Sequence, residues 1–246
     1  MPFPSPDLPI PSITTEQMIE VDRLMIEVYH IELIQMMENA GRCLALVAKE
    51  QFLQGNPRGK QIVILAGTGG NGGGALVAGR RLKTWGTEVS VCITHPARMT
   101  PIPAHQLDIL HRMKIPIVSL DTLKKKKEVV DLILDGIIGY SLSGAPRGIA
   151  RDMIHWANAQ KASTLSLDTP SGISLTTGQQ YDPTIKAEAT LTLALPKVGL
   201  FHEKILPFRG TLLLGDISVP PELYASPSLQ LKVGPLFARS DILSLI

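Results

Sequence analysis

The sequence is poor in cysteine, in aromatic residues and in net charge. Its only two cysteines, Cys43 and Cys92, stand in apolar surroundings far apart in the 246 residues. A disulfide framework or a thiolate metal site is therefore not expected, and buried free thiols in a reducing compartment are the simpler interpretation. Aromatic residues make up 4% of the chain, and the formal net charge is only +2. Neither value indicates base stacking or a positive surface field, so no nucleic-acid partner is expected.

Long apolar runs are also missing. No uninterrupted apolar stretch reaches the length that spans a bilayer, so no membrane partner is expected. Residues 1–11 are rich in proline and lack the basic and apolar regions of a secretory signal. We therefore expect a cytoplasmic protein. With 44% hydrophobic and 19% charged residues, the chain has the composition of a globular protein with a sizeable core.

The alternation of helix-like and strand-like segments indicates the fold class. A capping box at residues 14–17 predicts the start of a first helix, and a second helix is expected over residues 33–52. From residue 61 onward, apolar strands alternate with amphipathic helices. This order predicts an α/β fold with a three-layer, Rossmann-like, doubly wound and mostly parallel sheet after two N-terminal helices. We expect strands at 61–66, 88–94, 116–120, 129–134, 163–167, 187–195 and 211–219, and helices at 75–85, 103–114 and 149–160.

The most informative segment is residues 67–74, which hold six glycines in eight positions. It follows an apolar strand and precedes a helix, an arrangement that brings backbone N–H groups up to a phosphate. A P-loop is excluded because no Gly-Lys-Ser/Thr follows the glycines. The spacing Gly-x-Gly-x-x-Gly also matches a dinucleotide fingerprint, but a dehydrogenase needs an acidic residue at the end of the next strand, which here ends Ile-Thr-His-Pro. We expect a phosphate-bearing small molecule and reject a dehydrogenase.

Two further polar loops, residues 135–144 and 168–172, follow predicted strands. Ligands of open α/β sheets gather beyond the carboxyl ends of the strands, so we expect these loops to meet the loop of Asn71. Either Asp135 or Asp168 alone could simply cap the segment that follows it. Both together, beside glycine loops, favour a ligand site.

In this order the motifs resemble those of the NAD(P)H-hydrate epimerase family, the YjeF N-terminal domain. The resemblance implies a proline-rich tail at 1–12, an epimerase domain at 13–220 and a C-terminal tail or linker at 221–246. It rests on Met-Glu-Asn-Ala-Gly at 37–41, the glycine loop from 67 to 80, the Asp135 segment to 148, Asp-Thr-Pro-Ser-Gly at 168–172, Pro-Lys-x-Gly at 196–199 and Gly-Asp-Ile-x-x-Pro at 215–220.

The resemblance also implies a function in the repair of nicotinamide cofactors. The family interconverts the R and S epimers of hydrated NADH and NADPH, after which a separate ATP- or ADP-dependent dehydratase restores the cofactor. A homodimer through the N-terminal helices is a further implication. By the same resemblance, Asn71, Asp135 and Ser171 supply oxygen ligands to a potassium ion. The implied substrate-binding residues are Gly70, Asn71, Gly72, Gly73, Gly74, Gly139, Tyr140, Ser141, Leu142, Ser143, Gly144, Ala145 and Asp168.

Asp168 is our candidate catalytic residue. The hydrated carbon carries a hydroxyl beside the ring nitrogen, and the nitrogen lone pair can expel that hydroxyl once an acid protonates it. Water then returns to the other face of the planar cation. A carboxyl group that first donates and then accepts a proton fits both half-steps.

The glycine loop lacks two polar side chains of the family pattern, and it also has Thr68 in place of proline and Ala75 in place of glycine. Gly70 stands where the family has Asn, and Gly74 stands where it has Asp. Each lost side chain could cost roughly 0.5–1.5 kcal/mol of binding if it made a hydrogen bond. A second hypothesis is therefore a catalytically degenerate nucleotide-binding or scaffold module of the same fold. The retained Asp168 favours the enzyme.

Overall fold

A computed structural model describes residues 2–125, 129–140 and 142–245 of the protein. The strands are β1 (Gln61–Ala66), β2 (Glu88–Ile93), β3 (Leu132–Gly136), β4 (Ser163–Leu167), β5 (Ala189–Leu193), β6 (Thr211–Gly215) and β7 (Ile242–Ser244). The α-helices are α1 (Thr15–Glu27), α2 (Leu33–Val47), α3 (Gly70–Thr84), α4 (Pro101–Arg112), α5 (Leu120–Lys125), α6 (Gly148–Asn158), α7 (Leu206–Arg209) and α8 (Pro221–Tyr224).

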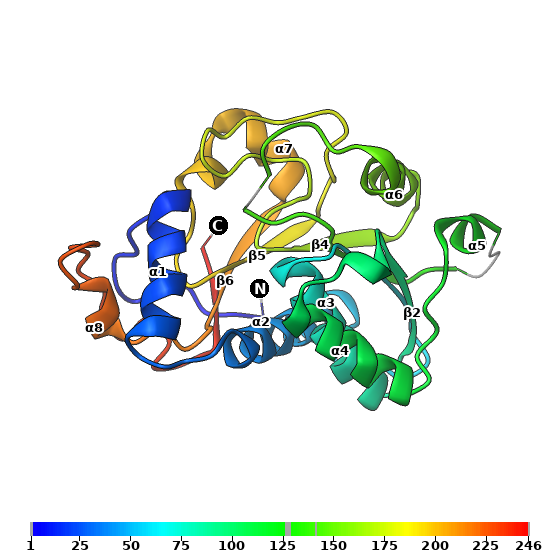
Figure 1. The fold of residues 1–246 in the computed structure, drawn as a ribbon, viewed down its shortest axis with the longest axis horizontal. Helices are drawn as coiled ribbons and strands as arrows, with labels where there is room; N and C mark the ends of the chain where they lie inside the picture. The colour runs from blue at the N-terminus through cyan, green and yellow to red at the C-terminus, as the bar shows by residue number, and fades with distance from the viewer. Residues whose placement is uncertain (1, 126–128, 141, 246) are drawn as a thin grey trace.

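All seven strands belong to one sheet with the order β2-β1-β3-β4-β5-β6-β7. Every pair from β2 to β6 is parallel, and only β7 runs antiparallel to its neighbour β6. Helices α2, α3 and α4 cover one face of the sheet, and α5 and α6 cover the other (Figure 1). The predicted three-layer, mostly parallel α/β fold is confirmed.

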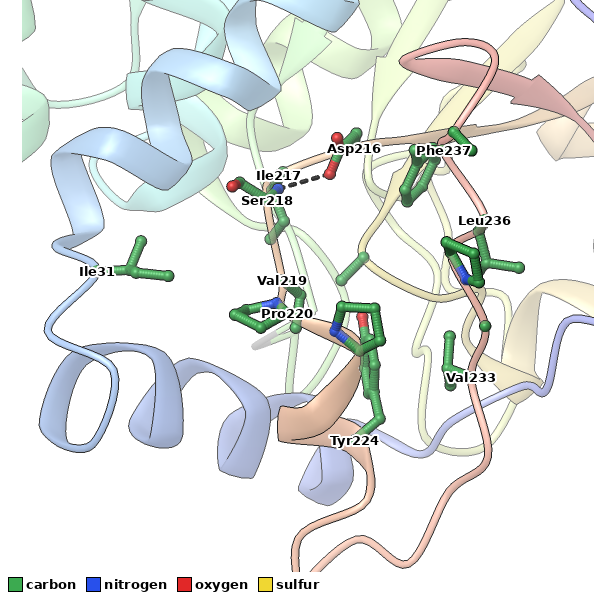
Figure 2. A pocket seen from close by; sticks show the side chains of 15 residues that line it. Ile31, Asp216, Ile217, Ser218, Val219, Pro220, Tyr224, Val233, Leu236 and Phe237 are labelled. Carbon is green, nitrogen blue, oxygen red and sulfur yellow. Dashed lines mark hydrogen bonds between the residues drawn. The ribbon is translucent and has the colours of Figure 1, made fainter.

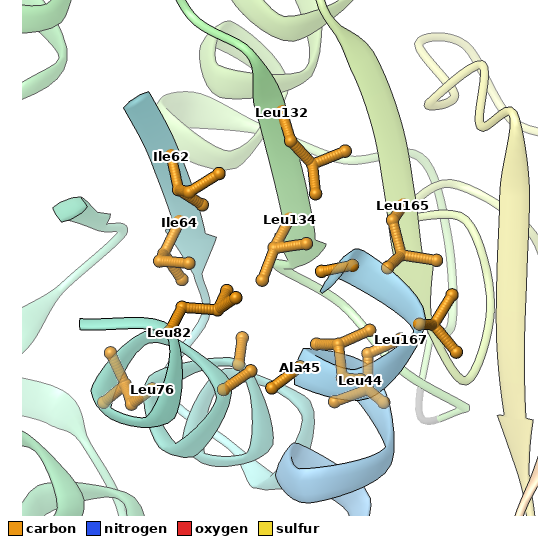
Figure 3. Packing of buried hydrophobic residues seen from close by; sticks show 14 of the residues in the cluster. Leu44, Ala45, Ile62, Ile64, Leu76, Leu82, Leu132, Leu134, Leu165 and Leu167 are labelled. Atoms are coloured by element: carbon orange, nitrogen blue, oxygen red, sulfur yellow. The ribbon is translucent and has the colours of Figure 1, made fainter. Parts of the chain in front are cut away.

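Side chains of β1 alternate between the two helical layers. Ile62 and Ile64 join the cluster with α2, α3 and α4, whereas Val63 and Leu65 pack with α5 and α6. Figure 3 shows the first cluster, with Leu82 of α3 pointing toward the strands. A strand that is covered on both faces has no side exposed to water. The sequence of β1 is therefore a nearly continuous apolar run.

The two N-terminal helices lie where the sequence predicts them. The side chain of Thr14 accepts a hydrogen bond from the Gln17 N–H at 3.2 Å, and the Gln17 side chain accepts one from the Thr14 N–H at 2.9 Å. This reciprocal pair is the predicted capping box, and it starts α1. Helix α2 continues as one π-helical turn over Ala48–Phe52, so its predicted end is also met.

One predicted strand is absent from the structure. Residues 116–120 form no strand: a single parallel bridge joins Ile117 to Val91, and α5 begins at Leu120. Among the described residues, no helix is both long and apolar enough to cross a bilayer.

The described part of the C-terminal segment, residues 221–245, contributes the edge strand β7 to the sheet, where the sequence predicts a tail or linker. Its strand β7 spans three residues, too few for a recognisable alternation. The Ser244 N–H donates to the Pro4 carbonyl at 2.8 Å, which brings both ends of the chain to this sheet edge. Residues 233–238 face the turn after β6 across a cavity of about 400 Å³ (Figure 2).

Candidate functional site

The carboxyl ends of β1, β3 and β4 meet at one edge of the sheet. Because β1 lies between β2 and β3, the chain leaves β1 toward one side and returns on the other, which opens a crevice at that point. Two cavities lie there and share Gly70, Asn71 and Tyr140. We call them the glycine pocket, which is lined by residues 67–72, 94–95, 137–140 and 150, and the aspartate pocket, which contains Asp168.

The glycine pocket of about 410 Å³ surrounds the start of α3. This helix begins at Gly70, five residues earlier than predicted, so half of the glycine segment forms the first helical turn. Its N-cap residue Gly69 makes no side-chain capping bond. The first N–H groups of a helix have no intrahelical acceptor, so they remain for an anion at the mouth of this pocket.

The glycines of this loop differ in what a side chain at each position would contact. A Cβ on Gly67 would lie 1.9 Å from the Ile137 carbonyl oxygen, so only glycine lets the ends of β1 and β3 approach this closely. A Cβ on Gly70 would meet nothing within 4 Å, and this residue lines both pockets. Gly74 is buried with its Cβ position 2.7 Å from Leu167, and neither it nor the buried Gly73 is part of the pocket lining.

Asp168 lies in the aspartate pocket in an ion pair with Lys197. The Lys197 Nζ lies 2.5 Å from Asp168 Oδ1 and also donates to the Leu193 carbonyl at 2.9 Å. The two charged side chains are 1% and 3% exposed. The Thr192 hydroxyl donates to the same carboxylate oxygen at 3.3 Å. Among the described residues, every hydrogen bond to this carboxylate falls on Oδ1, so Oδ2 is left for a ligand.

The backbone at Asp168 adopts the left-handed conformation, with φ at 65°. Non-glycine residues rarely adopt it, although aspartate does so more often than most. The Asp168 N–H donates to the Leu191 carbonyl at 2.7 Å, which ties this turn to the neighbouring strand β5. Unusual backbone conformations concentrate at ligand sites, so this turn supports a functional role for the carboxylate.

Asp135 and Ser171 form a buried cluster beneath the crevice. Asp135 Oδ1 accepts hydrogen bonds from the Ser171 hydroxyl at 2.6 Å and the Ile137 N–H at 3.2 Å. Its Oδ2 accepts from the Ser166 hydroxyl at 2.8 Å and the Ser171 N–H at 2.9 Å. Burial raises the pKa of Asp135, and these hydrogen bonds oppose the rise.

Asn71 reaches the same place from α3. Its Nδ2 donates to the Leu167 carbonyl at 2.8 Å, and a Cβ on Gly139 would lie 2.6 Å from its Oδ1. The amide therefore lies between the ends of β3 and β4, where Asp135 and Ser171 also lie. Among the described residues, no three His, Cys, Asp or Glu side chains come together as a metal site. An ion held here would be bound by amide, hydroxyl and carbonyl oxygens beside one carboxylate.

Among the described residues of the loop after β3, those at 137–140 line the crevice. Gly139 lines the glycine pocket and Tyr140 lines both pockets. Residues 142–145 lie outside both linings, and Ser141 lies outside the described residues.

Two charged residues of the aspartate pocket, Asp22 and Lys197, were not among the predicted site residues. Lys197 could have been found from the Pro-Lys-x-Gly motif at 196–199. Asp22 could have been found from the helical spacing of α1. It stands four residues after Met18 and three before Met25, so this carboxylate lies on the same helix face as two buried apolar side chains. The Tyr140 hydroxyl donates to Asp22 Oδ2 at 2.9 Å.

Comparison with known proteins identifies the family. The model of the YjeF-related protein N-terminus matches residues 33–199. The chain belongs to this family. A YjeF-family protein of Dehalogenimonas lykanthroporepellens, named NAD(P)H-hydrate epimerase, is 38% identical over 93% of this chain and 91% of its own length.

Other matches extend the comparison to fused proteins and to a solved structure. A Moorella thermoacetica protein named bifunctional NAD(P)H-hydrate repair enzyme is 33% identical over 87% of this YjeF-family chain, which spans only 42% of that relative. The crystal structure of a yeast protein superposes with a TM-score of 0.82 at 24% identity, over 96% of this chain and all of that one. The last likeness supports the fold alone.

Proposed function

We propose that this protein interconverts the R and S epimers of hydrated NADH and NADPH. The observation that carries the proposal is the buried Asp168–Lys197 pair, whose pocket shares Gly70, Asn71 and Tyr140 with the pocket at the N-terminus of α3. The relative of Dehalogenimonas lykanthroporepellens, alike over nearly its whole length, bears the name of this activity.

The two pockets suit two groups of the substrate, the pyrophosphate and the hydrated nicotinamide ring. The glycine pocket offers backbone N–H groups to the pyrophosphate. The aspartate pocket offers apolar walls to the ring, supplied by Met18, Leu33, Met36 and Met37. The free oxygen of Asp168 would meet the hydroxyl of the hydrated carbon and carry its proton. Lys197 would hold the carboxylate in place and stabilise its charge.

The test is the rate at which each purified epimer converts into the other, with the rate in buffer alone subtracted. The wild type should accelerate conversion, and Asp168→Asn should lose roughly a hundredfold or more of that acceleration. Asp108→Asn, an exposed carboxylate on α4, is the matched control and should keep it. Binding of the hydrate without acceleration would instead favour the degenerate nucleotide-binding module.

A potassium ion beside Asn71, Asp135 and Ser171 is part of the proposal. The Ser171 hydroxyl can turn its proton from Asp135 to the Ile138 carbonyl, 3.3 Å away, which would free a hydroxyl lone pair and a carboxylate oxygen for a cation. When bound, the ion would offset repulsion between the buried carboxylate and a pyrophosphate. Potassium should raise the midpoint of thermal unfolding of the wild type above that in sodium, and Asp135→Asn should lose the difference. An equal effect of both cations on the wild type would contradict this.

We further propose that the product passes to a dehydratase and that the protein forms a homodimer in the cytoplasm. The fused Moorella thermoacetica relative supports the coupling. The homodimer is supported by apolar side chains exposed on α1 and at the start of α2, Ile19, Ile26, Val28 and Leu33. The sedimentation coefficient should fall to that of a monomer when Ile19 and Ile26 are both replaced by Lys. The cytoplasm suits Cys43 and Cys92, which are buried and unbridged.

A further inference from the structure

The aspartate pocket contains a second carboxylate besides Asp168. Asp22 projects from α1 into the same cavity, whereas Asp168 comes from the end of β4. Asp22 is partly buried, and the Tyr140 hydroxyl donates to its Oδ2 at 2.9 Å. Within the described part of the chain, the Asp22 carboxyl group makes no other side-chain hydrogen bond. Its Oδ1 is therefore available to a ligand.

The two carboxyl groups have opposite surroundings. Asp168 lies 2.5 Å from the Lys197 ammonium, which stabilises the carboxylate anion. Asp22 receives a phenol hydrogen bond in place of an ion pair, and burial raises the pKa of Asp22. The charge of Asp168 and the phenol of Tyr224 also face it, and Lys197 acts in the opposite direction. A pair of carboxyl groups in such unlike surroundings suits one acid and one base.

Epimerisation at the hydrated carbon requires proton transfer on both faces of the ring. One hydroxyl leaves from one face, and one water attacks from the other. A single carboxyl group on one wall reaches both oxygens only if the ring turns over within the pocket. Resting on the proposed function, we propose that Asp22, held by Tyr140, is a second proton-transfer group and serves the ring face opposite to the one served by Asp168.

The step balances with water alone. Protonated Asp22 gives its proton to the hydroxyl, the C–O bond breaks with its electron pair on oxygen, and the nitrogen lone pair forms a C=N bond. A water oxygen then bonds to the carbon from the other face, the C=N electron pair returns to nitrogen, and the Asp168 carboxylate takes the proton of that water. One water leaves and one enters. Asp22 ends ionised and Asp168 protonated, which is the state required for the reverse conversion.

The test follows inversion and oxygen exchange together. Each epimer is incubated with the protein in water labelled with heavy oxygen, and both the inverted product and the labelled starting epimer are measured. Asp22→Asn keeps the size of the side chain and an acceptor for Tyr140 but cannot transfer the proton. Inversion should fall roughly a hundredfold or more. The epimer whose hydroxyl faces Asp168 should still exchange its oxygen without inverting, because that carboxyl group can expel and return water on its own face.

The control is Glu20→Gln, which removes a carboxylate from the same helix where it binds Arg23 outside the pocket. It should keep both rates. Asp22→Ser gives the same comparison if the asparagine variant does not fold. Unchanged inversion in a folded Asp22 variant, or equal losses of inversion and exchange from both epimers, would overturn the second group while leaving the proposed function intact. A wild type that converts neither epimer would overturn both.

Discussion

Replacing Lys197 by Met should destabilise the protein strongly. Methionine has nearly the length of lysine and fills the same space, so the change removes little more than the ammonium group. The loss leaves the Asp168 carboxylate without its cation in a place where both side chains are almost fully buried. It also leaves the Leu193 carbonyl without the donor that now lies 2.9 Å away.

The expected magnitude follows from this burial. Removing one partner of a buried ion pair typically costs about 3–5 kcal/mol, because the remaining charge has neither water nor a counter-ion. A protein of this kind has a total free energy of unfolding of roughly 5–15 kcal/mol, so Lys197→Met removes a large part of it. Replacing Asp168 by Asn in the same molecule removes the stranded charge. The double variant should therefore be more stable than Lys197→Met alone.

The assay is urea unfolding of the wild type, both single variants and the double variant, followed by far-ultraviolet circular dichroism. The four free energies of unfolding form a double-mutant cycle. For a charged pair in contact, the coupling energy should lie in the range of about 0.5–3 kcal/mol. Losses that simply add, or a loss below about 1 kcal/mol for Lys197→Met, would refute the ion pair as the element that holds Asp168.

Three further outcomes are expected. Gly67→Ala should lower the free energy of unfolding by about 1–3 kcal/mol, because the added Cβ would lie 1.9 Å from the Ile137 carbonyl oxygen. Gly70→Ala is the control and should change that free energy little, because its Cβ would meet nothing within 4 Å. Chemical denaturation measures both. Thr14→Ala should cost about 1 kcal/mol, read from the urea midpoint, because it removes the capping box of α1. Tyr140→Phe removes a hydrogen bond that lowers the pKa of Asp22, so that pKa should rise. Conversion that needs protonated Asp22 is lost as the pH rises through this pKa, so its decline in a pH–rate profile should move to higher pH.

The sequence predicts the sheet well because its strands are buried on both faces. The segment Gln61–Ala66 is apolar from its second residue onward, and its predicted bounds match β1. The strand β7 is also buried, but it escapes prediction because it is short. It has three residues at an edge, and its place depends on pairing with β6, which lies far from it in sequence. Local composition carries no information about such a pairing.

The site is predictable where a motif marks a strand end, and less so where tertiary packing brings in a residue from elsewhere. Asn71 and Asp168 follow strands and lie in the crevice, as the rule for open α/β sheets predicts. Asp135 is predicted just after a strand, but it lies within β3, is buried and is outside both pocket linings. The rule therefore places it near the crevice without giving its exposure. Asp22 comes from α1, whose packing beside the crevice cannot be read from the strand order.

The two glycines that depart from the family pattern in the glycine loop, Gly70 and Gly74, differ in their surroundings. A side chain at position 70 would meet nothing within 4 Å of its Cβ, and this position lines both pockets, so Gly70 leaves open space at the lining of each. A polar residue at position 74 would collide with Leu167 in the interior, so Gly74 belongs to the packing of α3 against β4. The loss of an acidic residue there removes nothing from the pocket lining of this chain. The change at position 70 therefore concerns the pocket lining and the change at position 74 concerns the packing, whereas the proposed proton-transfer groups Asp168 and Asp22 are present regardless.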